Sequence, residues 1–124
     1  MKQISTPHAP AAIGPYSQAL RSGNMVFVSG QIPIDPATGA MADTIEEQAK
    51  QALTNLKNVL QAAGLRMDQV IKTTVFLADL KDFPTVNAVY ESFFRAPYPA
   101  RSCVQVAGIP KGAGVEIECI AIEE

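Results

Sequence analysis

The sequence contains one histidine, only two cysteines, no cluster of basic residues and no long apolar run. The single histidine, His8, leaves no ligand set for zinc and no Ser/His/Asp or Cys/His catalytic pair. Cys103 and Cys119 both lie in apolar, strand-like segments, which favours buried free thiols in a reducing compartment, although one bridge between them stays open. The composition therefore argues against a zinc site and against a histidine-activated nucleophile.

The chain is slightly acidic, with a formal net charge of -2. No run of Lys or Arg provides the positive footprint that a phosphate backbone requires, so we expect no nucleic-acid partner. No segment approaches the roughly 18 apolar residues of a membrane span, and residues 1–6 show neither a secretory signal nor a transit-peptide pattern. We expect a cytoplasmic protein that does not contact a membrane.

Two segments have the periodicity of helices in a chain of 124 residues, a length that suits one domain with one core. The first begins at Asp43, the expected N-cap with Glu46 three residues later, and ends at Gly64. The second follows Asp82, carries Pro84 in its first turn and ends before residue 96. Both present one apolar face, which predicts packing against a sheet.

Strands are expected at residues 25–30, 69–78, 99–107 and 115–122, with a turn at 22–24 that joins the first to an earlier extended segment. In the last strand, Val115, Ile117, Cys119 and Ala121 share one face, opposite Glu116 and Glu118. This order of elements predicts an α+β fold in which a mixed sheet carries both helices on one face. The other face then needs covering, which favours a homo-oligomer with a ligand cleft between subunits.

Arg101 is the most unusual residue of the sequence, because its segment otherwise resembles a buried strand. A period of two puts Val104 and Val106 on a face that we assign to the core, and Arg101 and Cys103 on the opposite face. An arginine in this place needs water, a carboxylate partner or an anionic ligand. It is therefore either a solvated or ion-paired residue at a strand end, or a site for a substrate carboxylate.

The loop at 108–114 is short, which predicts that strands 99–107 and 115–122 are antiparallel neighbours. Glu116 would then lie close to Arg101. Such a pair is either a structural cross-strand ion pair, or an arginine that holds a substrate carboxylate beside a glutamate that handles protons or orients water. Spacing alone leaves both alternatives open.

Several motifs resemble the Rid family, also called the YjgF family: Gly14-Pro15-Tyr16-Ser17-Gln18-Ala19, Ser29-Gly30-Gln31-Ile32-Pro33, residues 70–77, and Pro99-Ala100-Arg101-Ser102-Cys103-Val104 with residues 115–118. They span nearly the whole chain, and the Arg-Ser-Cys segment is most similar to the RidA subgroup of enamine and imine deaminases. The resemblance implies a single Rid-family domain over residues 1–124 with a chorismate-mutase-like fold. It also implies a homotrimer whose sheets form a central barrel, with a cleft at each subunit interface.

For function, the resemblance implies an enzyme without metal or cofactor that hydrolyses 2-aminoacrylate, 2-aminocrotonate and their imine tautomers to 2-keto acids and ammonia. Arg101 matches the residue that binds the substrate carboxylate, and Glu116 is the candidate for orienting the water. The other expected cleft residues are Tyr16, Ser29, Gly30, Asn87 and Cys103, the last through its backbone. Each has a structural alternative: Tyr16 as core filler, Ser29 and Gly30 as a turn, and Asn87 as an exposed helix residue.

Two other classes of function stay open. Members of the family have been described as ribonucleases or translation inhibitors, which the acidic balance and the lack of paired histidines argue against. The other class is a non-catalytic sensor of small carboxylates or a chaperone-like regulatory protein. Arg101 fits ligand sensing as well as it fits catalysis. Only turnover separates the enzyme from the sensor.

Overall fold

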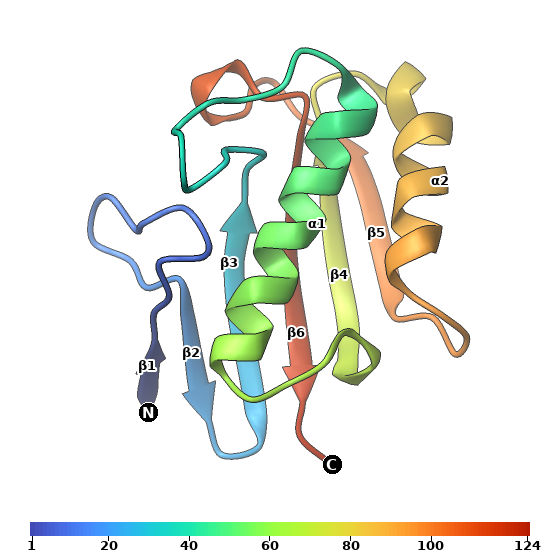
Figure 1. The fold of residues 1–124 in the computed structure, drawn as a ribbon. Coiled ribbons are helices and arrows are strands. Elements are labelled where there is room, and N and C mark those ends of the chain that lie inside the picture. The colour runs from blue at the N-terminus through green and yellow to red at the C-terminus, as the bar shows by residue number, and fades with distance from the viewer.

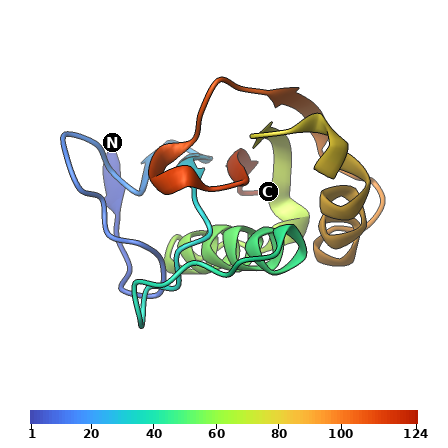
Figure 2. The same cartoon turned by 90° about the horizontal axis from the view of Figure 1, so that it is seen from above.

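The structure, a computed structural model, describes all 124 residues and consists of one six-stranded sheet with two helices on one face (Figure 1). Seen from above, both helices lie on the same side of the sheet, as the sequence predicts (Figure 2). The strands are β1 (Lys2–Ile4), β2 (Ala19–Ser22), β3 (Met25–Gln31), β4 (Val70–Leu77), β5 (Ala100–Gln105) and β6 (Val115–Ile122), and the helices are α1 (Ile45–Ala62) and α2 (Phe83–Phe93). Short 3-10 turns occupy Met67–Gln69, Leu80–Asp82 and Pro110–Gly112.

Helix α1 packs its apolar stripe against the sheet, and Ala49, Ala52, Leu53, Leu56, Val59 and Leu60 are fully buried. The N-cap is Thr44, whose hydroxyl accepts a hydrogen bond from the backbone N–H of Glu47. The expectation that Asp43 caps the helix is therefore wrong by one residue, because Thr44 has the same three-residue spacing to a glutamate and the required extended backbone. Gly64 follows the helix with φ of 79°, the left-handed conformation that favours glycine after a helix end.

The strand order is β1-β2-β3-β6-β4-β5, so β6 lies at the centre of the sheet and β5 at its edge. Strand β5 pairs only with β4, in parallel, and β4 separates it from β6. The predicted antiparallel pairing of the arginine strand with the last strand is thus wrong. Helix α2 connects β4 to β5 and returns the chain to the same end of the sheet, which is the connection that a parallel pair requires.

The two faces of the sheet differ in their cover. Val115, Ile117, Cys119 and Ala121 of β6 face the helices and are buried, as predicted, whereas Glu116, Glu118, Ile120 and Ile122 point to the open face. On β5 the prediction is reversed, because Val104 lies on the open face with 43% exposure, while Arg101 and Cys103 point to the side of α2. The open face therefore carries exposed apolar side chains, among them Phe27 and Val104.

Both cysteines are free thiols, with Cys119 buried in the core and Cys103 partly buried at the sheet edge. Burial raises the pKa of Cys119 to about 12, and the nearby Glu118 carboxylate adds to this effect. His8 is exposed, in agreement with its expected place on the surface. Neither helix combines the length and apolar character that a membrane crossing requires.

Asn55 ties the loop after β3 to helix α1 from a fully buried position. Its amide donates to the carbonyls of Ile32 and Ile34 at 3.0 and 2.9 Å, and its oxygen accepts from Gln51. We expect Asn55→Ala to lower the free energy of unfolding by about 2 to 4 kcal/mol, because it leaves two loop carbonyls without donors in the interior.

Urea denaturation measures this loss. The control is Asn58→Ala, which removes one exposed hydrogen bond to the His8 carbonyl and should change stability by less than about 1 kcal/mol. Equal losses in the two variants would contradict the role assigned to Asn55.

Candidate active site: two groups of residues

Arg101 extends from the edge strand β5 toward helix α2, where three side chains surround its guanidinium. Its Nη1 donates a hydrogen bond to Oδ1 of Asn87 over 2.8 Å. The guanidinium carbon lies 4.8 Å from the ring centroid of Tyr90 and 5.4 Å from that of Phe83, both within the range of cation–π attraction. The group is thus held by one amide and two aromatic rings.

A cavity of about 380 Å³ opens beside this arginine and is lined by Asn87, Tyr90, Glu91, Tyr98, Pro99 and Arg101. Arg101 takes part in none of the ion pairs of the chain, so its charge is not neutralised by a carboxylate. The structural alternative of a cross-strand pair with Glu116 is therefore wrong within one chain. With one N–H of five committed to Asn87, the guanidinium keeps donors for a planar anion such as a carboxylate.

Glu116 belongs to a second group of residues, on the open face of the sheet. Strand β3 bulges between Val28 and Gln31, and this brings the backbone of Gly30 against the Glu116 side chain. A Cβ at Gly30 would lie only 2.5 Å from Oε2 of Glu116. Any side chain at residue 30 would therefore force the Glu116 carboxylate to move. Partial burial, and to a smaller degree the negative charge of Glu118, raise the pKa of Glu116 above its usual value.

Ser29, the residue before Gly30, and Tyr16 line a shared cavity of about 470 Å³. The Ser29 hydroxyl donates to the carbonyl of Ser17 at 2.6 Å, which fixes the loop that presents Tyr16. Tyr16 is 52% exposed, so the alternative that it fills the core is wrong. Its ring is available to a ligand or to another protein surface.

The structure thus divides the seven expected site residues into two groups. The arginine group contains Asn87, Arg101 and the adjacent Cys103, and the glutamate group contains Tyr16, Ser29, Gly30 and Glu116. Strands β6 and β4 separate β3, which carries Ser29 and Gly30, from β5 by about 14 Å at the usual distance between strands, and β4 alone separates β6, which carries Glu116, from β5 by about 10 Å. Since Arg101 and Glu116 also point to opposite faces of the sheet, one chain does not bring them together.

Cys103 follows Arg101 at the next position on the same face and packs partly against the core. Burial raises the pKa of its thiol, and the nearby Arg101 charge lowers it by a smaller amount. No histidine lies in either group, so the thiol stays protonated and is a poor nucleophile near neutral pH. No three His, Cys, Asp or Glu side chains come together in a way that would hold a metal ion.

The sequence analysis missed the residues that surround Arg101. In the sequence, Tyr90 and Phe83 belong to the apolar face of the second predicted helix and Thr73 to the predicted strand at 69–78, and nothing in this pattern links them to Arg101. One signal was present, because a tyrosine in a buried stripe must find a hydrogen-bond partner for its hydroxyl. Here the partner is Thr73, at 2.7 Å.

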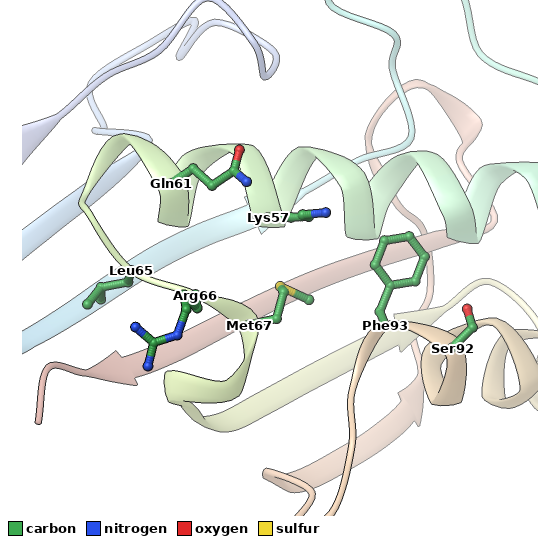
Figure 3. A pocket seen from close by; sticks show the side chains of 7 residues that line it. All are labelled: Lys57, Gln61, Leu65, Arg66, Met67, Ser92 and Phe93. Atoms are coloured by element: carbon green, nitrogen blue, oxygen red, sulfur yellow. The ribbon is translucent and has the colours of Figure 1, made fainter.

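Another cavity, of about 540 Å³, lies between α1 and the end of α2 and is lined by Lys57, Gln61, Leu65, Arg66, Met67, Ser92 and Phe93 (Figure 3). Its Arg66 is already paired with Asp68 at 3.0 Å. None of its lining side chains belongs to either group of expected site residues. We therefore locate the chemistry at the sheet, not at this groove.

A family model described as Endoribonuclease L-PSP matches residues 6–123. The chain belongs to this family. The 2-iminobutanoate/2-iminopropanoate deaminase of Salmonella typhimurium is 56% identical over 124 residues, which cover 98% of this chain and 97% of that protein. A protein of the same name from Bos taurus is 52% identical over 123 residues, with 98% and 90% covered.

Solved structures of proteins similar to this chain share the fold. E. coli TdcF with bound serine has a TM-score of 0.97 at 50% identity and covers 100% of both chains. The YjgF gene product of E. coli has the same TM-score at 51% identity, again with 100% of both chains covered. These likenesses confirm the Rid (YjgF) resemblance and the α+β fold expected from the sequence.

Proposed function

We propose that this protein is an enamine and imine deaminase that converts 2-aminoacrylate and 2-aminocrotonate, through their imine tautomers, to 2-keto acids and ammonia. The observation that carries the proposal is the Arg101 guanidinium, which has no carboxylate partner and faces a cavity. Relatives more than 50% identical over nearly the whole chain bear the name of such a deaminase. The substrates of this reaction carry the carboxylate that Arg101 is suited to bind.

The complete site, in this proposal, forms between two copies of the chain. The arginine group of one copy meets the glutamate group of the next, because a single copy keeps them on different strands and faces. The exposed apolar side chains of the open face supply the contact surface, which favours the homotrimer expected from the resemblance. Each of the three interfaces would then hold one equivalent site.

The chemistry requires binding, one positioned water and the movement of protons. The enamine takes a proton at its β-carbon and loses one from nitrogen, which gives the imine. Water then adds to the imine carbon, and the carbinolamine releases ammonia as its hydroxyl proton is lost and the carbonyl forms. Arg101 holds the carboxylate, and Glu116 as carboxylate accepts a proton from the attacking water. Tyr16, Ser29, the Gly30 backbone and Asn87 complete the cleft, with Cys103 contributing through its backbone.

A coupled assay tests the proposal. Threonine dehydratase releases the transient enamine, and the appearance of 2-ketobutyrate and ammonia is followed with and without this protein. Acceleration above the spontaneous rate is the expected result. Absence of acceleration together with measurable binding of 2-ketobutyrate would indicate a carboxylate sensor and not an enzyme. Cleavage of RNA without deaminase activity would favour the endoribonuclease activity for which the family is named.

The pH dependence follows from the direction of the Glu116 shift. The carboxylate form is active, so activity falls as pH drops through the raised pKa of Glu116, at a higher pH than for an ordinary glutamate. Glu118→Gln removes one of the two causes of the shift and should move this acidic limb toward lower pH. The measurement is kcat/KM against pH, with Glu46→Gln on α1 as the control that leaves the profile in place. An unchanged limb in Glu118→Gln would contradict the assignment to Glu116.

A further inference from the structure

The contacts of Arg101 extend into the core through Tyr90. The Tyr90 ring lies 4.8 Å from the guanidinium carbon, and the residue itself is only 4% exposed. Its hydroxyl shares a 2.7 Å hydrogen bond with the hydroxyl of Thr73, which is fully buried on β4. Thr73 is also the residue that pairs directly with Arg101 across the parallel strands. The three residues therefore form one connected unit from core to cavity.

An arginine at an exposed strand edge would otherwise sample many rotamers, and it would lose that freedom when it binds a carboxylate. The Tyr90 ring restricts the guanidinium from one side and Asn87 fixes its Nη1. The ring cannot swing away, because the buried hydroxyl of Thr73 holds its far end. Burial raises the pKa of Tyr90, more than the Thr73 hydrogen bond and the Arg101 charge lower it, so the phenol stays neutral beside the arginine.

We propose that Tyr90, held by Thr73, is a positioning residue that preorganises Arg101 for carboxylate binding. The inference rests on the proposed function, but its physical content is separate: the order of Arg101 in the free protein depends on the Tyr90 ring. Tyr90 contacts the guanidinium and acts through it. Its effect is on substrate affinity more than on the proton transfers.

Two variant pairs separate the ring from its anchor. Tyr90→Leu removes the ring, and Tyr90→Phe keeps the ring and loses only the hydroxyl. Thr73→Val removes the anchor at nearly constant volume, and Thr73→Ser keeps a hydroxyl that can rescue it. Phe93→Leu is the matched control, because it removes a partly buried aromatic ring from the same helix at a position that faces the groove between α1 and α2 (Figure 3).

The first measurement uses the free protein. NMR relaxation of the Arg101 Nε–H should show an ordered group in the wild type and in Phe93→Leu, a mobile group in Tyr90→Leu, and intermediate order in Tyr90→Phe, which keeps the ring but loses its hydrogen bond to Thr73. A mobile Arg101 in the wild type, or equal order in Tyr90→Leu, would overturn the inference whatever the activity. If Arg101 is ordered as expected while the coupled assay shows no turnover, the proposed function fails and the positioning role survives.

The second measurement uses 2-ketobutyrate as the probe, with calorimetry for its Kd and the coupled assay for KM and kcat. Tyr90→Leu should weaken binding and raise KM by about tenfold with kcat within about threefold of the wild type. Thr73→Val should fall between Tyr90→Leu and the wild type, with Thr73→Ser close to the wild type. In an Arg101→Ala background, Tyr90→Leu should add no further loss, since it acts through the arginine. An additional tenfold loss of affinity in that background would show that Tyr90 does not act through Arg101 and has only a structural role.

Discussion

Arg101→Ala is expected to lower kcat/KM for the transient imine by about a thousandfold, equivalent to about 4 kcal/mol. The guanidinium has no carboxylate partner in the chain and its Nη1 is fixed by Asn87, so its removal takes away the only cation that lines the cavity. Arg101→Lys keeps the charge but loses the planar fork, and we expect it to recover only a small part of the loss. The dehydratase-coupled assay measures both variants.

Arg95→Ala is the matched control for this prediction. Arg95 is an exposed arginine just before the same edge strand, and it pairs with Asp68 at 3.2 Å. Its loss should leave kcat/KM within about twofold of the wild type, because an exposed pair of this kind contributes little. Because Arg101 is itself exposed, both variants should keep the fold and the oligomer size. Equal activity of Arg101→Ala and Arg95→Ala would show that Arg101 does not bind the substrate.

Glu116→Gln is expected to lower kcat by about a hundredfold, the usual contribution of one group that moves a proton. The KM should change by less than about threefold, because Arg101 and not Glu116 holds the carboxylate. The amide is nearly isosteric and fits the space against Gly30, so the effect is chemical and not steric. Steady-state kinetics near neutral pH separate the two parameters.

Glu118→Gln serves as the control for Glu116→Gln, because it lies two residues away on the same open face and is exposed. Near neutral pH it should keep kcat within about threefold of the wild type. A variant Glu116→Gln with full kcat and a large rise in KM would contradict the role as proton acceptor. It would make Glu116 part of the binding surface for the substrate.

The local pattern of the sequence predicted most elements, because helix and strand periodicity follow from which residues must be buried. The stripe of α1 and the alternation of β6 both appear in the structure as the sequence indicates. The prediction of which β5 side chains face the helices was wrong, because valines in an edge strand do not reveal which face of the sheet the helices cover. Val104 faces outward, and the arginine faces α2.

The pairing of strands depends on contacts between segments that are far apart in the sequence. The short loop between β5 and β6 predicted that these strands are neighbours, and this prediction was wrong. The chain from β5 to β6 passes over the end of β4, which already pairs with both strands. For the same reason, spacing placed Arg101 and Glu116 together although one copy separates them. The resemblance named seven residues, but the Tyr90 ring and its Thr73 anchor emerged only from side-chain geometry.

In the proposed site, two copies of the chain contribute to each cleft, with Arg101 from one copy and Glu116 from the next. Mixed oligomers of Arg101→Ala and Glu116→Gln test it most directly, after the two inactive variants are unfolded and refolded together in equal amounts. In a closed ring about one quarter of the interfaces would join an intact arginine group to an intact glutamate group. We therefore predict recovery of about a quarter of the wild-type activity. A mixture no more active than its separate components would contradict the shared site and place all catalytic groups within one copy.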